Sequence, residues 1–293
     1  MRRRYLELLK SALGDRLYPR AEDAEVTLAE LSRAEGLSAQ VRQLLSLPAI
    51  PQEQRSLLER LSTTDNETMA RFLRDNTPRA HTLVSRAALD NVEDCVATAL
   101  AQGVTGDLME CGVWQGGVTI LMRALLEAYA DPDRQVWVAD SFQGLPRPDP
   151  SVDVLDAALH TFLHAVGGLA VSLEAVQENF RRYDLLDERV RFLPGWFADT
   201  LPGAPIERLA VLRLDGDWYE STRTALECLY PRVSPGGFVI IDDYAELFGA
   251  QRAVDEYRKS HAIASPLIQV NDQVHYWRKP YPTATIISES RRA

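Results

Sequence analysis

From residue 105 onward, short apolar segments alternate with segments of helical period. Strands are expected at 107–111, 135–139, 190–193, 209–214 and 237–241, with weaker strands near 266–270 and 274–278. Helices are expected between them, at 118–129, 172–184, 219–230 and 249–259. This alternation predicts an α/β fold, a mostly parallel sheet with helices on both faces. Right-handed crossovers then place the carboxyl ends of the strands along one edge, where open sheets bind ligands.

The residues before 105 show helical periodicity and no convincing strand. Amphipathic segments are expected at 5–17, 26–31, 41–45, 57–61 and 85–100, with two prolines breaking the pattern at 48 and 51. We therefore divide the chain into an N-terminal helical region, 1–104, and a second domain, 105–293.

The charge balance argues against a nucleic-acid partner. The chain has 32 Lys+Arg against 42 Asp+Glu, a formal charge of -10, whereas phosphate binding needs clustered cations. Three cysteines cannot form a disulfide framework, which favours a reducing compartment. No apolar run reaches the roughly 20 residues that span a bilayer, and no signal peptide is recognisable at the start. We expect a cytoplasmic enzyme without membrane contact.

Acidic side chains follow the expected strands. Glu110 ends the first strand and is followed by a glycine-rich turn that lacks the G-x-G-x-x-G pattern of dinucleotide enzymes. Its carboxylate would repel a phosphate but suit an ammonium or sulfonium group. Asp140 ends the next strand, where a carboxylate can accept both hydroxyls of a ribose. Together they fit S-adenosylmethionine; the alternative is a tight turn followed by a capping aspartate.

Three further aspartates are expected to converge. Asp215 follows the strand at 209–214, and Asp242 and Asp243 follow the strand at 237–241. Left unpaired they would repel one another and raise a pKa, and a hard cation such as Mg²⁺ or Ca²⁺ would relieve this. Alternatively, Asp242 or Asp243 caps the next helix, or each aspartate pairs with an arginine. Asp217 is expected to cap the helix that begins near Trp218.

Long motifs resemble the macrocin O-methyltransferase family, whose members methylate deoxysugars of macrolides and the noviose of novobiocin-type antibiotics. They are ECGVWQGG at 110–117, VWVADSFQG at 136–144, VRFLPGWF at 190–197, LDGDWYEST at 214–222 and SPGGFVIIDDY at 234–244, with shorter matches at 80–82 and 274–278. The resemblance spans roughly residues 78–279, and 5–17 resembles the family's first helix.

The resemblance implies a class I methyltransferase fold, a seven-stranded Rossmann-like sheet with one antiparallel strand. It also implies S-adenosylmethionine as donor and Mg²⁺ as cofactor. The implied metal ligands are Asp215, Asp242 and Asp243, with Asp215 also the general base. The implied donor contacts are Asp140 and Ser141 at the ribose, Glu110 and Gly112 at the methionine part, Trp196 and Phe197 at the adenine, and Thr82 beneath an N-terminal lid.

The region from 21 to 76 looks longer than the family's usual connection, which in the family shapes the acceptor pocket and the dimer. We therefore expect a homo-oligomer, most simply a homodimer, acting on a small glycoside acceptor. Two other functions stay open from sequence: a Mg²⁺-dependent methyltransferase of phenolic or catechol hydroxyls, and a protein that binds the donor without turnover and docks a partner.

Overall fold

The structure is a computed structural model that describes residues 2–14, 80–153, 156–157, 160, 169–244 and 249–281. The helices expected at 26–31, 41–45 and 57–61 lie outside these residues. Within the described part of the chain, no helix is long and apolar enough to cross a membrane.

The sheet has seven strands in the order β3-β2-β1-β4-β5-β7-β6. Neighbouring strands from β3 to β5 are parallel, and β7 is antiparallel to both β5 and β6. The seven-stranded class I methyltransferase topology is therefore confirmed. The strands are β1 (Asp107–Cys111), β2 (Val136–Asp140), β3 (Val190–Pro194), β4 (Leu209–Leu214), β5 (Val233–Ile241), β6 (Ile268–Gln269) and β7 (His275–Arg278).

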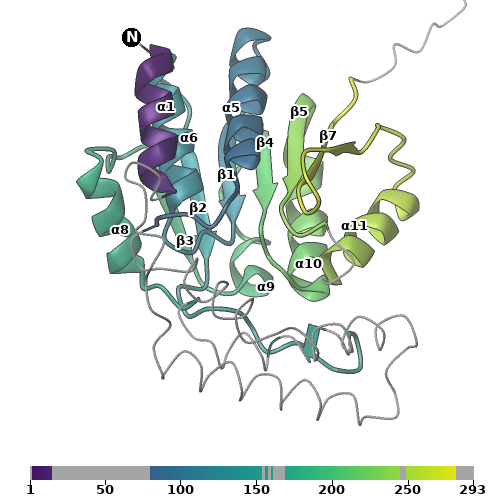
Figure 1. Ribbon diagram of the computed structural model, residues 1–293. Helices are drawn as coiled ribbons and strands as arrows, with labels where there is room; N and C mark the ends of the chain where they lie inside the picture. Colours follow the sequence, from purple (N-terminus) through teal and green to yellow (C-terminus); the bar gives the residue numbers. More distant parts are fainter. Residues whose placement is uncertain are drawn as a thin grey trace, which may run out of the picture.

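Helices cover both faces of this sheet (Figure 1). Side chains alternate along each strand, so Leu108 packs on one face and Met109 on the other. The first face carries α1 (Arg2–Leu13), α5 (Arg86–Ala101), α6 (Gly117–Ala128) and α8 (Leu173–Arg182). The second carries α9 (Phe197–Thr200), α10 (Tyr219–Leu229), a 3₁₀ turn (Tyr230–Arg232) and α11 (Gly249–Ser260).

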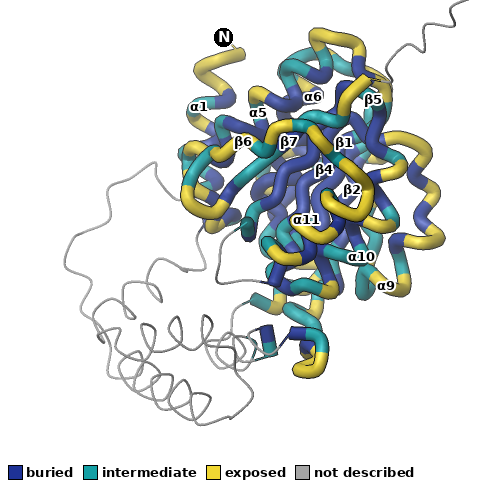
Figure 2. Tube along the Cα trace, turned by 90° about the vertical axis from the view of Figure 1, so that its right-hand side faces the viewer, coloured by how far each residue is buried: buried dark blue, intermediate teal, exposed yellow. Residues whose placement is uncertain are grey.

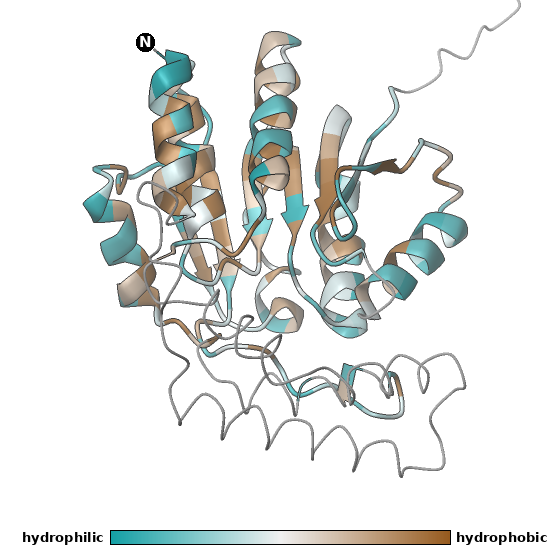
Figure 3. Ribbon diagram, viewed as in Figure 1, coloured by the Kyte–Doolittle hydropathy of each residue, from teal (hydrophilic) through white to brown (hydrophobic). Residues whose placement is uncertain are grey.

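The core lies in and against the sheet. Figure 2 shows the central strands as buried, and Figure 3 shows them as the most hydrophobic part of the chain. Leu6, Leu9 and Leu13 of α1 belong to the same buried cluster as Leu89 of α5 and Leu121 of α6. The described ends of the N-terminal helical region thus pack directly on one face of the sheet.

One strand boundary differs from the sequence prediction. We expected a strand at 237–241 only, but β5 begins at Val233 and includes the turn-forming sequence Ser234-Pro235-Gly236. The ladder to β4 shifts register between Leu209 and Val211, so the turn is an irregularity inside the strand. Gly236, with φ +80°, supplies the backbone conformation that this irregularity needs.

Candidate active site

The carboxyl ends of the parallel strands are held at one level by hydrogen bonds that continue beyond the strands. The N–H groups of Gly112, Asp215 and Asp242 donate to the carbonyl oxygens of Ala139, Cys111 and Leu214, each at 2.9 Å. Because every bond joins one strand end to its neighbour, the ends of β2, β1, β4 and β5 are fixed side by side along this edge, and with them Asp140, Asp215 and Asp242.

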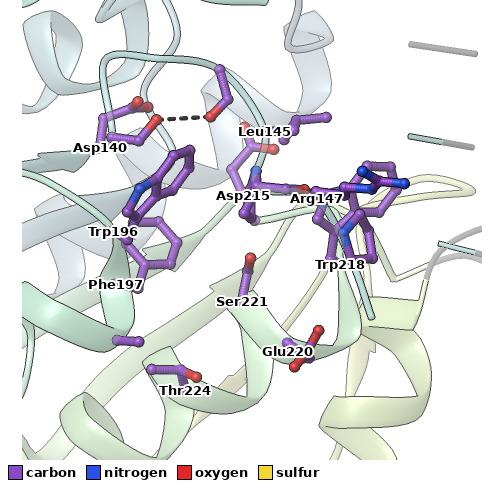
Figure 4. A pocket seen from close by; sticks show the side chains of 17 residues that line it. Asp140, Leu145, Arg147, Trp196, Phe197, Asp215, Trp218, Glu220, Ser221 and Thr224 are labelled. Carbon is purple, nitrogen blue, oxygen red and sulfur yellow. Dashed lines mark hydrogen bonds between the residues drawn. The ribbon is translucent and has the colours of Figure 1, made fainter. Parts of the chain in front are cut away.

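A pocket of about 300 Å³ opens at this edge (Figure 4). The rings of Trp196 and Phe197 lie on one side of Asp215, and Arg147 and Trp218 lie on the other. Of the residues singled out from sequence, the lining includes Gly112, Asp140, Ser141, Trp196, Phe197 and Asp215. It does not include Thr82, Glu110, Asp242 or Asp243.

Gly112 allows β1 and β4 to end in contact. Its φ is +84°, and a Cβ at this position would lie 1.7 Å from the carbonyl oxygen of Asp215. No side chain can occupy that space, so glycine is required for the backbone to turn away from the sheet beside Asp215.

Asp140 organises the turns on either side of it. Its Oδ2 accepts the Val113 N–H and its Oδ1 accepts the Phe142 N–H, each at 2.7 Å. Burial raises the pKa of Asp140, while these backbone donors lower it. The neighbouring Ser141 hydroxyl donates to the Gly144 carbonyl at 2.7 Å. Asp140 therefore ties the glycine-rich turn after β1 to the turn after β2.

Arg213 is the site residue that the sequence analysis missed. It lies at 1% exposure beside Glu110 in the β1–β4 register, and its guanidinium pairs with Glu110, Asp215 and Asp242. The available signal was a lone cation inside the apolar run 209–214. The alternative of arginine pairing, left open from sequence, thus holds for Asp215 and Asp242.

Glu110 faces this arginine at 1% exposure. Burial raises its pKa to about 8, against the lowering effect of Arg213. Its Oε1 accepts from Arg213, while its buried Oε2 has no hydrogen-bond partner among the described residues. An unsatisfied buried carboxylate oxygen is costly, so this atom is a candidate contact for a bound cationic group.

Asp215, Asp242 and Asp243 come together as expected. One carboxylate oxygen from each lies within 4.8 Å of the other two. Burial raises the pKa of Asp242 to about 6, although Arg213 lowers it. Burial also raises the pKa of Asp243 well above its usual range, and the charge of Asp217 adds to this. A hard divalent cation could hold these oxygens.

Asp217 does not cap α10 as predicted. The helix has Trp218 as its N-cap residue, without a side-chain cap bond, and Asp217 adopts φ +56°. Its N–H donates instead to Asp243 Oδ2 at 2.9 Å. The first N–H of the helix, from Tyr219, donates to Asp156, a residue that the sequence pattern did not single out.

Thr82 lies behind the glycine-rich turn. Its hydroxyl accepts the Val84 N–H at 3.1 Å, and the carbonyl of the preceding His81 accepts the Gly117 N–H at 2.8 Å. His81 also bonds the Tyr183 hydroxyl through Nδ1 at 2.8 Å. This segment therefore supports the start of α6.

Comparisons with known proteins point to one family. The family model Macrocin-O-methyltransferase (TylF) matches residues 2–279. The 8-demethyl-8-(2,3-dimethoxy-alpha-L-rhamnosyl)-tetracenomycin-C 4'-O-methyltransferase of Streptomyces olivaceus is 55% identical, over 68% of this chain and 76% of the relative. The mycinamicin III 3''-O-methyltransferase of Micromonospora griseorubida is 52% identical, over 68% of this chain and 79% of the relative.

Among solved structures, the O-methyltransferase NovP superposes with a TM-score of 0.73 at 41% identity, covering 96% of this chain and all of NovP. The family match, over residues 2–279, spans the strand-end motifs that build the pocket. The chain therefore belongs to the macrocin O-methyltransferase family and is an O-methyltransferase.

Proposed function

We propose that this enzyme is Mg²⁺-dependent and methylates a hydroxyl group of a deoxysugar on a glycosylated natural product. The observation that carries the proposal is the convergence of Asp215, Asp242 and Asp243 beside a pocket that Asp140 and Trp196 also line. The cluster of three aspartates can thus serve the acceptor, while Asp140 binds the methyl donor.

Family membership implies S-adenosylmethionine as that donor. The Asp140 carboxylate accepts the N–H groups of Val113 and Phe142 and also lines the pocket, where it would accept a ribose hydroxyl. Trp196 and Phe197 offer aromatic surface to the adenine, and Ser141 and Gly112 complete the wall. Glu110 Oε2, which has no hydrogen-bond partner among the described residues, suits the donor's ammonium group. Thr82 is proposed only to support this site through α6.

The acidic cluster fits a magnesium ion. Its three donors are carboxylate oxygens, the ligand type that Mg²⁺ prefers. Arg213 supplies one positive charge against Asp215, Asp242 and Glu110, and Asp243 adds a further carboxylate. The site is therefore short of positive charge even after this arginine is counted.

The protein's own groups would then perform the transfer. Asp215, which lines the pocket, would accept the proton of the acceptor hydroxyl. Bound Mg²⁺ would supply charge that lowers the pKa of that hydroxyl. Asp140 and the aromatic pair would hold the donor so that the attacking oxygen and the sulfur align, since orientation supplies much of the rate advantage.

A sugar acceptor is supported by the names of the relatives, which act on a rhamnosyl tetracenomycin and on a mycinamicin. We also propose a cytoplasmic homodimer in which residues 1–104 contribute oligomer contacts, an N-terminal lid and part of the acceptor pocket. On α1, Tyr5 is 40% and Leu8 60% exposed, so apolar surface is available for such contacts. Light scattering would measure the assembly.

The test is transfer of a labelled methyl group from S-adenosylmethionine to matched acceptors: a deoxysugar glycoside, its aglycone and a catechol. We expect labelling of the glycoside alone, its loss with chelator and its return with added Mg²⁺. Labelling of the catechol but not the glycoside would overturn the sugar assignment. Undiminished transfer in chelator would overturn the role of the metal.

A further inference from the structure

A described part of the chain between β2 and α8 forms one wall of the pocket. Five consecutive residues, 144–148, line it, and Figure 4 shows Arg147 beside Trp218, across Asp215 from the aromatic pair. The carbonyl of Pro146 accepts the Trp218 indole N–H at 3.1 Å. This wall therefore faces the part of the pocket that the proposed donor contacts leave free.

Asp156 attaches this wall segment to two helices at once. Its Oδ2 accepts the N–H of Tyr219 at 2.7 Å, and its Oδ1 accepts the N–H of Gly249 at 2.8 Å. Tyr219 and Gly249 are the first residues of α10 and α11. N–H groups in the first turn of a helix lack partners within the helix and carry partial positive charge, so one carboxylate satisfies a donor from each.

The surroundings are shaped for this carboxylate. Asp156 is 1% exposed, and burial raises its pKa to about 7, against the lowering effect of the two N–H donors. A Cβ on Gly249 would lie 2.3 Å from Asp156 Oδ2, so only glycine leaves room for it. Since the positions of Asp156 and Gly249 are 93 residues apart, the fit is a property of the tertiary structure.

A second attachment lies beside the first. The Arg252 guanidinium, on α11, donates to Asp153 Oδ2 at 2.9 Å and to the Val152 carbonyl at 2.8 Å. α10 itself carries Glu220, Ser221 and Thr224 of the pocket lining. The helix that bounds the pocket and the segment that closes its other side thus meet at Asp156.

We propose that Asp156 is a positioning residue for acceptor binding, because it fixes the wall at 144–148 against α10. The inference rests on the proposed function, in which the acceptor lies between this wall and Asp215. An asparagine at 156 could accept from one helix, but its amide nitrogen would face the N–H of the other. The segment would then lose one of the two bonds that Asp156 accepts from the helices, without any change in the donor contacts.

The experiment compares Asp156→Asn and Gly249→Ala with Ser172→Ala. Ser172 caps α8 by accepting the Ala175 N–H, so its variant also loses a helix cap, but away from the pocket lining. For both test variants we expect the acceptor KM to rise by at least about tenfold, the lower range for a bond to a charged group. The donor Kd is expected to stay within about twofold of wild type, because no donor contact is removed.

Two readouts separate this proposal from its premise. Hydrogen exchange of the amides at 144–153 needs no acceptor, and we expect it to be faster in Asp156→Asn than in Ser172→Ala. Equal exchange, or an acceptor KM no higher than in Ser172→Ala, overturns the role of Asp156. Failure of wild type to methylate any glycoside overturns the proposed function alone. If the buried variants do not fold, Arg252→Ala replaces them, because the Arg252 side chain is 45% exposed. We expect this variant to raise the acceptor KM as well, and an unchanged acceptor KM overturns the proposal.

Discussion

The Nη1 atom of Arg213 lies 2.8 Å from Oδ2 of Asp215, the carboxylate that lines the pocket. The same guanidinium pairs with Glu110 and Asp242. Removing one partner from such a buried cluster destabilises the fold, because it leaves buried charges without compensation. The arginine therefore holds Asp215 in a fixed position at the pocket wall, as the proposed general base requires.

Asp215→Asn should lower kcat by at least about 10²-fold, the lower end for loss of a general base. The variant keeps the side-chain volume but loses the charge, so donor affinity should change little. Single-turnover kinetics and donor calorimetry would measure the two effects. Glu227→Gln, at an exposed carboxylate of α10, is the control for loss of one negative charge. An Asp215→Asn enzyme as fast as wild type would contradict the role.

Asp242→Asn and Asp243→Asn should each raise the Mg²⁺ concentration for half-maximal activity by at least about tenfold, because ligand charge sets the affinity for hard cations. In the Asp243→Asn variant, the amide oxygen of the new side chain could still accept the Asp217 N–H, so the fold should persist. Metal calorimetry without substrates gives a second measure. Unchanged affinity in both variants would leave these aspartates without a metal role.

The sheet could be predicted because its signals are local. Apolar runs and helical periods locate β1 to β5 and the helices between them, and an acidic residue after a parallel strand must lie at the carboxyl edge. That reasoning places Asp140, Asp215, Asp242 and Asp243 correctly at one edge. The specific roles within the donor site came only from family resemblance.

The contacts that depend on distant segments could not be predicted. Asp156 accepts hydrogen bonds from N–H groups at two helix starts, 63 and 93 residues away, and no local sequence pattern indicates these bonds. Asp217 precedes α10, where a capping residue is expected, but its backbone is left-handed. The Tyr219 N–H at the start of this helix donates to the carboxylate of Asp156 instead. Arg213 was visible as a lone cation, although its three partners depend on strand register.

Asp140→Asn should weaken S-adenosylmethionine binding by about 1–3 kcal/mol, because charge-assisted bonds to the ribose are lost. One amide nitrogen would also face a backbone N–H, from Val113 or Phe142. Asp131→Asn is the matched control, since Asp131 precedes the same strand and accepts the N–H groups of Asp133 and Arg134. Equal donor affinity in wild type and Asp140→Asn would reject the ribose contact.

Gly112→Ala should disrupt the site and the fold together. The new Cβ would meet the Asp215 carbonyl at 1.7 Å in a backbone with φ +84°, so β1 or β4 must move. We expect a loss of more than about 3 kcal/mol, combining backbone strain with overpacking, measured by denaturant unfolding. Gly203→Ala, whose new Cβ would have no atom of the described residues within 4 Å, should stay within about 0.5 kcal/mol of wild type. Equal stability of the two variants would contradict the close approach.

Lys10 is a buried cation that joins α1 to α5. Its Nζ lies 3.1 Å from Glu7, 2.5 Å from Asp90 and 2.6 Å from Glu93, at 2% exposure. Lys10→Met keeps the apolar stem but leaves three carboxylates together. Because two of them are nearly half exposed, water recovers part of the cost, and we expect a loss of about 1–3 kcal/mol.

The loss should depend on pH in a defined direction. Hydrogen bonds from Arg86 and Lys10 lower the pKa of Glu7; burial raises the pKa of Asp90, but the bonds from Lys10 and Arg86 together outweigh it and lower that pKa as well. A depressed carboxyl pKa stabilises the fold above the unfolded value, and this stabilisation is lost as the pH falls through the folded value. The stability gap between wild type and Lys10→Met should therefore shrink as the pH falls below about 4, from the unperturbed carboxyl pKa values toward the lower folded values. The control is Arg181→Met, which breaks an exposed pair with Glu178 and should differ little from wild type in stability at every pH. If the stability difference between wild type and Lys10→Met is the same at neutral and acidic pH, packing rather than charge holds α1 to α5.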